Sequence, residues 1–518
     1  MKYFLLILIF SSLLFFSFLG GTSVFQVAEA RNAECAREMM ESEEWIVPTF
    51  NGELRTDKPA LEYYGMIAGY KLLGTNEGGA RFFSALCGML VVLATYWIAR
   101  RHWSEKAAWW SALSMLASIH LIVQFRLATP DPYLILCHTL SIYFFYEGWY
   151  SHRWKWFALM YIFLGLGIFA KGPVGLLLPG LTYLLFMLVT KTLTWKRILE
   201  QKPWWGVLIV TAVALPWYYA VSVKTGGVWT RAFFFEHNLN RFDTGLDGHH
   251  GPFVMPVLFV LAGMLPFSVF AIRAFKETWR QRKTNSLLLM TALSTIVVIV
   301  FYAVSHTKLI NYTSPAYPFL SLMVGSTIAG LSANKVTYQK LRNEIYIIVF
   351  ITLVLPVAVF FFARNTPPLQ GIGWIAWFLF LLPVGGVVAL VLRKRSIQYG
   401  LCAIAAAFMV TTFIIFWKPF QVMDDQSPVQ KYEALVSSHK EVVAYKDFDN
   451  AFAFYAEKRI PVFQQEKQLK AYLASHEDVL VLCRDRDLSY MDKIANLQCI
   501  GKHHDLFSRC STGVYHER

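Results

Sequence analysis

Residues 156–190 are WFALMYIFLGLGIFAKGPVGLLLPGLTYLLFMLVT, two apolar runs that are separated by one charged residue, Lys171. Each run approaches the roughly 20 residues that a helix needs to cross the hydrocarbon core of a bilayer. Gly172 and Pro173 follow the lysine and favour a tight turn. The stretch therefore predicts two membrane-spanning helices with a lysine at the turn between them.

The same pattern recurs along the 518 residues, of which 56% are hydrophobic and only 16% are charged. A soluble chain of this length would carry many more charged residues. We therefore predict an all-α membrane fold of about thirteen transmembrane helices. They are expected near residues 4–27, 82–99, 107–125, 133–146, 156–170, 172–190, 204–223, 253–272, 285–304, 310–333, 345–363, 371–392 and 397–417.

Basic residues orient the predicted spans, because Lys and Arg in short loops stay on the cytoplasmic side. Basic clusters follow every second span, for example at 100–106, 191–202 and 273–283. This alternation predicts a multi-pass protein of a bacterial inner membrane with a cytoplasmic N-terminus. The external side then receives a first loop at 28–80, a loop at 224–252 and the tail from 424.

The tail alternates short apolar runs with helical patterns, which is typical of a small α/β domain. We expect a transmembrane catalytic domain at 1–423 and a periplasmic α/β domain at 424–518. The tail holds 13 Lys plus Arg and 15 Asp plus Glu, so the net charge of +14 arises in the membrane part. Retention of basic loops explains that charge, and we expect no nucleic-acid partner.

Two other features leave alternatives open. Residues 2–27 are expected to form the first span, but Lys2 before an apolar run and Ala28-Glu29-Ala30 after it also fit a signal peptide. The seven cysteines show no metal-ligand spacing, and Cys499 and Cys510 could form a disulfide in an oxidising compartment.

Charged residues gather at the outer ends of the predicted spans. Glu29 and Arg31 follow the first span, and Asp57 and Lys58 lie further along the first loop. A lipid-linked sugar phosphate needs cations at the headgroup level, and transfer to a hydroxyl needs a carboxylate that accepts its proton. The alternatives are an exposed pair on a surface helix for Glu29 and Arg31, and a solvated turn for Asp57 and Lys58.

Three further places carry chemistry on the same side. Lys171 suits a phosphate contact or a cap at a helix end. The loop at 224–252 is dense in carboxylates and imidazoles, which could bind a divalent ion or form a hydrogen-bonded loop. Lys308 adds a further cation on the same side.

In order along the chain, the motifs are Glu29-x-Arg31, Trp45-Ile46-Val47-Pro48, Asp57-Lys58-Pro59, Ala80-Arg81, Ala170-Lys171-Gly172-Pro173, Pro216-Trp217-Tyr218, Glu236-His237 with Arg241, and Lys308-Leu309 with Tyr312. Together they resemble the aminoarabinose transferases that modify lipid A, within the protein O-mannosyltransferase superfamily of GT-C fold. The resemblance covers nearly the whole chain. One departure concerns residue 28, where this chain has Ala28 and the family commonly has Asp.

The resemblance implies a GT-C bundle with an external active site and an inverting transfer from a polyprenyl-phosphate-sugar donor. It implies that Arg31 and Lys58 hold the phosphate, with help from Arg241. Lys171 and Lys308, which are expected on the same side, are further candidates for a phosphate contact. It also implies that Asp57 and His237 approach a divalent ion, which could be zinc, magnesium or manganese.

We therefore predict a glycosyltransferase that moves a sugar from undecaprenyl phosphate to lipid A, a surface glycan or a protein. Membrane lipids are expected to surround the enzyme. Glu29 or Asp57 is expected to activate the acceptor hydroxyl. The rival function is a transporter or flippase for polyprenyl-linked saccharides. It would predict charges or Gly/Pro breaks inside paired spans, and these are not evident in the sequence.

Overall fold

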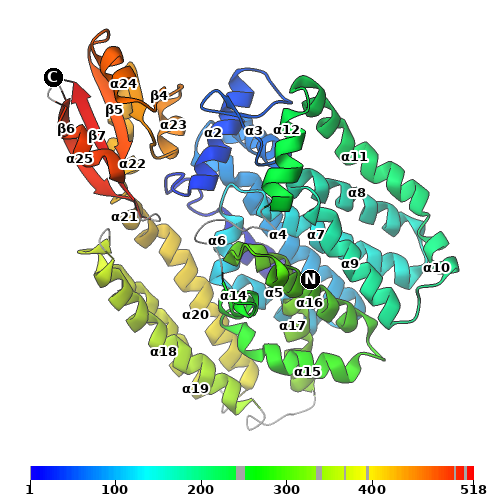
Figure 1. Ribbon diagram of the computed structural model, residues 1–518. Coiled ribbons are helices and arrows are strands. Elements are labelled where there is room, and N and C mark those ends of the chain that lie inside the picture. Colours follow the sequence, from blue (N-terminus) through cyan, green and yellow to red (C-terminus); the bar gives the residue numbers. More distant parts are fainter. Residues whose placement is uncertain are drawn as a thin grey trace.

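The computed structural model is a bundle of helices with a small sheet domain at one end (Figure 1). It describes residues 2–240, 251–333, 341–366, 369–392, 396–494, 497–506 and 510–517. The longer bundle helices are α1 (Lys2–Phe16), α4 (Glu77–His102), α5 (Glu105–Leu116), α6 (Ile119–Phe125), α7 (Asp131–Ser151), α8 (Trp154–Lys171), α9 (Val174–Val189), α11 (Pro203–Lys224), α14 (Met255–Gly263), α16 (Ser286–Val304), α17 (Tyr317–Ala333), α18 (Arg342–Asn365), α19 (Leu381–Leu392) and α20 (Ile397–Trp417). Shorter helical pieces are α10 (Trp195–Glu200), α12 (Val228–Arg231), η1 (Ala232–Asn240), η2 (Phe267–Phe270), α15 (Ala271–Gln281), η3 (Ile310–Ala316), η6 (Gly373–Phe380) and α21 (Pro419–Asp424).

The helical membrane architecture is confirmed, but the count of thirteen spans is not. Within the described residues, seven helices are long and apolar enough to cross a membrane, or eight if the bent pair α5 and α6 is one span. That pair covers the predicted span 107–125 and bends by 73°, because Ser118 caps a new helix by accepting a hydrogen bond from the Leu121 N–H. The predicted span 253–272 is divided among α14, η2 and α15, and 310–333 starts as a 3₁₀ segment that contains Pro315.

The turn predicted around Lys171 is present. Lys171 is the last residue of α8, and Gly172 follows it with φ 73°. That conformation suits glycine, and a Cβ at this position would lie 2.7 Å from the ring of Phe233. Glycine therefore allows the turn and the close approach of η1.

The first apolar segment is a shorter helix than predicted and is part of the bundle. It ends at Phe16, and Ile7, Leu14 and Phe15 are buried in the main apolar core. The ring of Phe15 meets that of Phe125 edge-on, with centroids 5.7 Å apart. The first helix therefore packs into the core of the bundle.

The first loop is folded. It forms α2 (Val27–Glu41), a hairpin of β1 (Thr49–Phe50) and β2 (Glu53–Leu54), and α3 (Leu61–Leu73). Asn51 and Gly52 make the hairpin turn with φ 54° and 74°, the signs that a type I′ turn requires. Asn51 and Gly52 therefore connect two short strands by a tight turn.

The predicted α/β tail domain is also present. Its five strands lie in the order β4-β3-β5-β7-β6, with β3 parallel to β4 and β5, and β7 antiparallel to β5 and β6. The strands are β3 (Glu441–Tyr445), β4 (Val462–Phe463), β5 (Val479–Arg484), β6 (Leu497–His504) and β7 (Ser511–Glu517), and the helical pieces are α22 (Pro428–Ser438), α23 (Ala451–Ala456), α24 (Glu466–Leu473), η7 (Asp485–Asp487) and α25 (Leu488–Met491).

The possible disulfide between Cys499 and Cys510 is not formed in the structure. Cys499 lies opposite Tyr515 in the β6–β7 ladder, whereas Cys510 lies just before the His504–Ser511 pair at the other end of that ladder. The strand register therefore keeps the two sulfurs at opposite ends of the hairpin.

The tail domain packs against the first loop (Figure 1). Asp424 accepts hydrogen bonds from the Ser23 backbone and hydroxyl, both at 2.6 Å. The Asn51 side chain bonds both backbone groups of Ile460, and one apolar cluster runs from α2 and α3 into the sheet. The first loop and the tail domain therefore form one layer above the bundle.

Candidate active site

Two adjoining cavities open where the bundle meets the first loop and the tail domain. One has a volume of about 440 Å³ and the other about 630 Å³. Asp57, Lys58, Lys171 and Tyr312 line both of them. A ligand that fills both cavities would therefore pass these four residues.

The smaller cavity has a mostly apolar wall. Its lining includes Leu177, Phe233, Phe234, Phe301 and Tyr302. These side chains come from α9, η1 and α16, so the cavity lies among helices of the bundle. Such a wall suits a hydrocarbon chain.

The larger cavity is polar and reaches from the bundle to the tail domain. Arg31 and Arg55 line it from the first loop, Asp131 lines it from the bundle, and Asp449 and Arg484 line it from the tail domain. It can therefore contact a polar ligand from both domains.

Asp57 is the carboxylate at the junction. Its side chain is 30% exposed, and its oxygens lie 3.7 Å from Arg55 Nη2 and 3.6 Å from His237 Nε2. Burial alone would raise the pKa of Asp57, but Arg55, Lys58, His237 and Arg31 outweigh it and hold the pKa below its usual value. The carboxylate is therefore ionised at neutral pH and faces the cavities.

Lys171 reaches the junction from the turn after α8. Its Nζ donates to Asp131 Oδ1 at 2.5 Å and lies 4.9 Å from the centre of the Tyr312 ring. Asn311 donates to the second oxygen of Asp131 at 3.1 Å. Asp131 thus holds Lys171 beside the point where the cavities meet.

Sequence reasoning missed Asp131 and Arg55. Asp131 starts α7 within Thr129-Pro130-Asp131-Pro132, and a carboxylate at the head of an apolar stretch was the available signal. Arg55 donates from Nη2 to Asn32 at 2.6 Å, while its buried Nε and Nη1 have no hydrogen-bond partner in the described structure. Two unpaired guanidinium nitrogens beside a polar cavity favour an anionic ligand there.

Comparisons with known proteins agree with this geometry. The profile of the family described as dolichyl-phosphate-mannose-protein mannosyltransferase matches residues 57–219. The undecaprenyl phosphate-alpha-4-amino-4-deoxy-L-arabinose arabinosyl transferase 2 of Pseudomonas fluorescens is 30% identical over 60% of this chain and 57% of its own length. The corresponding transferase of Shewanella sediminis is 25% identical over 85% of this chain and 82% of its own length.

The fold matches a solved structure over almost its entire length. The crystal structure of ArnT from Cupriavidus metallidurans bound to undecaprenyl phosphate superposes with a TM-score of 0.83 at 19% identity, covering 98% of this chain and 97% of that one. The chain is a glycosyltransferase of GT-C fold that is similar to the aminoarabinose transferases. It is a multi-pass membrane enzyme.

Glu29 lies outside both cavities of this glycosyltransferase. It is fully buried, and its two oxygens accept hydrogen bonds from Arg81 at 2.7 and 2.9 Å, with a further one from the Ala128 N–H at 2.9 Å. The structure therefore separates Glu29 from Arg31, which is exposed in the polar cavity. The surface pair that the sequence also allowed is not formed, because Glu29 faces the interior.

The other predicted cations have different surroundings. Lys308 donates to the backbone oxygens of Ala303 and Ser305 at 3.1 and 2.6 Å, so it caps the end of α16 and is not among the cavity-lining residues. Arg241 lies outside the described residues. Of the predicted phosphate ligands, the structure thus brings Arg31, Lys58 and Lys171 to the cavities.

The predicted metal pair is close together. Asp57 Oδ1 and His237 Nε2 are 3.6 Å apart, a separation that two ligands of one ion can have, and the Thr56 hydroxyl lies 3.0 Å from the same nitrogen. Among the described residues, no third His, Cys, Asp or Glu joins the pair. Two protein ligands do not complete an ordinary zinc site, so a divalent ion here stays a prediction.

A charged cluster forms the tail-domain wall of the polar cavity. Arg484 Nη2 lies 2.5 Å from Asp505 and 3.3 Å from Asp449. Burial raises the pKa of Asp449 to about 6, and Arg484 opposes that rise only in part. This wall carries carboxylates as well as a guanidinium, so it can accept hydrogen bonds from sugar hydroxyls.

The stability of the glycosyltransferase should depend on pH through Asp449. Its folded-state pKa is about 6, above the roughly 3.9 of an unfolded aspartate, so its contribution is most favourable below pH 4 and is lost as pH rises through 6. We expect Asp449→Asn to melt a few degrees above the wild type at pH 7.5, and this gap to close by pH 4.5. Melting curves in detergent would measure it, and parallel curves for the two proteins would contradict the assignment.

Proposed function

We propose that the chain is an inverting transferase that moves a sugar from undecaprenyl phosphate to a hydroxyl of lipid A or a related surface glycan on the periplasmic face. One observation carries this proposal: Asp57, Lys58, Lys171 and Tyr312 line both an apolar and a polar cavity. A polyprenyl-phosphate sugar has the same division, with an apolar chain, a phosphate and a polar head.

The lipid chain of the donor lies in the apolar cavity, and its sugar lies in the polar cavity. The phosphate then sits at the junction, within reach of Lys58 and Lys171. Arg55 supplies buried guanidinium nitrogens to an anionic group in the polar cavity. The acceptor enters from the tail-domain side, where Arg484 and Asp449 line the wall.

In the reaction, the acceptor oxygen attacks C1 of the sugar and forms the new glycosidic bond. The bond from C1 to the phosphate oxygen breaks, and its electron pair leaves with the phosphate. The hydroxyl proton goes to Asp57, which is ionised and partly exposed in the cavity. Lys58 and Lys171 stabilise the negative charge on the departing phosphate.

Asp131 and Glu29 act through other residues in this scheme. Asp131 orients Lys171 through their hydrogen bond. Glu29 fixes Arg81, which also donates to the backbone oxygens of Leu19, Thr22 and Ser23. Glu29 therefore holds the start of the first loop against the end of the first span.

The test is a transfer assay with protein purified in detergent. The enzyme would be incubated with membrane lipid extract, and undecaprenyl phosphate release and acceptor mass would be followed by mass spectrometry. A gain of a pentose or hexose mass on a lipid A species supports the proposal and identifies the sugar class. Movement of an intact carrier-linked sugar across a vesicle bilayer without transfer would replace it by the transporter function.

Lys58 and Lys308 form a matched pair of lysines for a first mutational prediction. Lys58→Met should lower kcat/KM by on the order of 10²-fold, because the junction loses a cation that stabilises the leaving phosphate. Lys308→Met should leave kcat/KM within about twofold and lower the melting temperature, because it loses only a helix cap.

Steady-state release of undecaprenyl phosphate would measure both variants. Equal losses of activity in the two would contradict the separate roles that the structure gives these lysines.

A further inference from the structure

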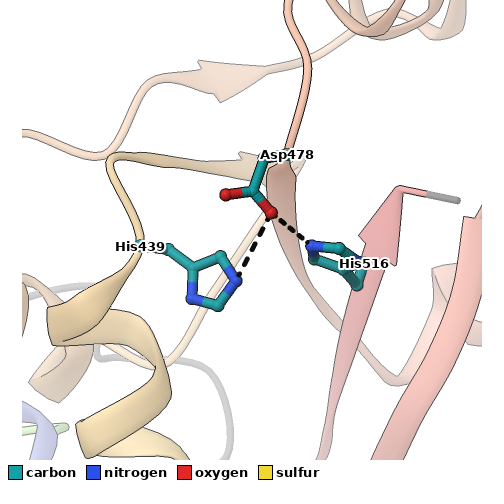
Figure 2. A group of neighbouring side chains, drawn as sticks. All are labelled: His439, Asp478 and His516. Carbon is teal, nitrogen blue, oxygen red and sulfur yellow. Dashed lines mark hydrogen bonds and ion pairs between the residues drawn. The ribbon is translucent and has the colours of Figure 1, made fainter.

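Three side chains outside the cavities gather at one edge of the tail-domain sheet: His439, Asp478 and His516 (Figure 2). His439 stands two residues before β3, and Asp478 directly before β5. Glu441 lies opposite Val479 in the parallel pair, and His516 lies opposite Leu480 in the antiparallel pair. The register of three neighbouring strands therefore places one residue from each at the same edge.

The distances suit a shared cation. His516 Nε2 lies 2.7 Å from Asp478 Oδ1, and His439 Nε2 lies 3.9 Å from the same oxygen. One ligand atom from each of the three residues lies within 4.8 Å of the others. Two ligand atoms of one tetrahedral zinc ion lie about 3.4 Å apart. The observed separations bracket that value, so small side-chain rotations would complete the geometry.

The tautomer of His439 also suits a metal ligand. Its Nδ1 lies 2.8 Å from the backbone oxygen of Leu435. A carbonyl oxygen only accepts, so Nδ1 carries the hydrogen and donates it. In the neutral ring, Nε2 then has a free electron pair on the side that faces Asp478. A backbone carbonyl that fixes the second nitrogen in this way is typical of metal-binding histidines.

We propose that His439, Asp478 and His516 bind a zinc-class divalent cation, with water completing the coordination. Two imidazoles and one carboxylate are the donor set that such ions prefer. This site is separate from the pair of Asp57 and His237, and it does not depend on the proposed transfer reaction.

The position of the site indicates its effect. β5 starts beside Asp478 and ends at Arg484, which lines the polar cavity roughly 20 Å away along the strand. β3 likewise leads from His439 toward Asp449 at the cavity. An ion at the far edge therefore ties together the strands that carry the tail-domain wall of the cavity.

Zinc titration of the purified full-length protein tests the proposal. After chelator treatment and desalting, zinc chloride would be titrated against a chromophoric chelator for the wild type, His439→Gln and His516→Gln. His476→Gln is the matched control, because His476 belongs to the same domain but stacks on Tyr472 at 3.9 Å. The variant His237→Gln shows how much of the bound zinc is held at the pair of Asp57 and His237.

We expect the wild type and His476→Gln to bind about one equivalent of zinc more than His439→Gln and His516→Gln. Zinc should raise the melting temperature of the first two proteins by several degrees and leave that of the other two unchanged. If a histidine variant fails to fold, Asp478→Asn replaces it, because Asp478 is 71% exposed and should fold normally. Equal zinc binding in the wild type and the variants, or no binding in the wild type, would overturn the proposal and show that the three residues only form ion pairs with one another.

Discussion

Replacing Asp57 by asparagine should lower the rate of sugar transfer by on the order of 10³-fold, because the amide cannot accept the acceptor proton. The change keeps the side-chain volume, so the cavities keep their shape. Single-turnover release of undecaprenyl phosphate would measure the chemical step directly. Asp57→Glu serves as the control, since it keeps the carboxylate and should retain part of the activity.

The pH dependence gives a second readout for the same residue. Although burial would raise the pKa of Asp57, the cations around it hold that pKa below its usual value. The active ionised form, and the stabilising ion pairs, are therefore present from neutral pH down through the ordinary carboxylate range, and they are lost as pH falls through the depressed pKa. An activity loss centred near pH 6 to 7, or an Asp57→Asn variant within fivefold of wild type, would transfer the role of base to another carboxylate, with Asp131 the first to test.

Replacing Glu29 by glutamine should destabilise the fold by about 3 kcal/mol, while the molecules that do fold keep nearly the wild-type kcat. Glu29 and Arg81 form a buried ion pair with two hydrogen bonds, and the variant leaves the guanidinium without its countercharge. Thermal unfolding in detergent would measure the loss, and activity per folded molecule would separate it from chemistry.

A double-mutant cycle sharpens this prediction. The double variant Glu29→Gln/Arg81→Gln should lose less stability than the sum of the losses of the two single variants, because the pair acts as a unit. A Glu29→Gln protein of normal stability with kcat reduced 10²-fold or more would instead make Glu29 a catalytic residue, which is the other assignment that the sequence allowed.

Much of the architecture could be predicted from local sequence. The run at 156–190 predicted two helices and the turn at Lys171, and Gly172 made that turn sterically possible. Alternating apolar runs and helical patterns predicted the α/β tail domain. The predicted count of about thirteen spans is not confirmed by the described helices, and composition does not show where Ser118 or Pro315 interrupts an apolar stretch.

The site could be predicted only in part, and Glu29 and Arg31 show why. Residues two apart on a helix are about 200° apart around its axis, so one faces inward when the other faces the cavity. The alanines that alternate with the charges on α2 do not define which side is buried. Only packing against Arg81 settles that Glu29 is the inward residue.

The sequence by itself determined the membrane fold, the positions of the longer loops and the residue types that the chemistry needs, because these follow from hydropathy and turn-forming residues near one another in the chain. The tertiary structure decided which charges meet. Lys171 and Asp131 are 40 residues apart, and Arg484 and Asp449 come from a domain that follows the last span, yet all four line one cavity. Such contacts depend on how helices and domains pack, and a single sequence carries no local signal for them.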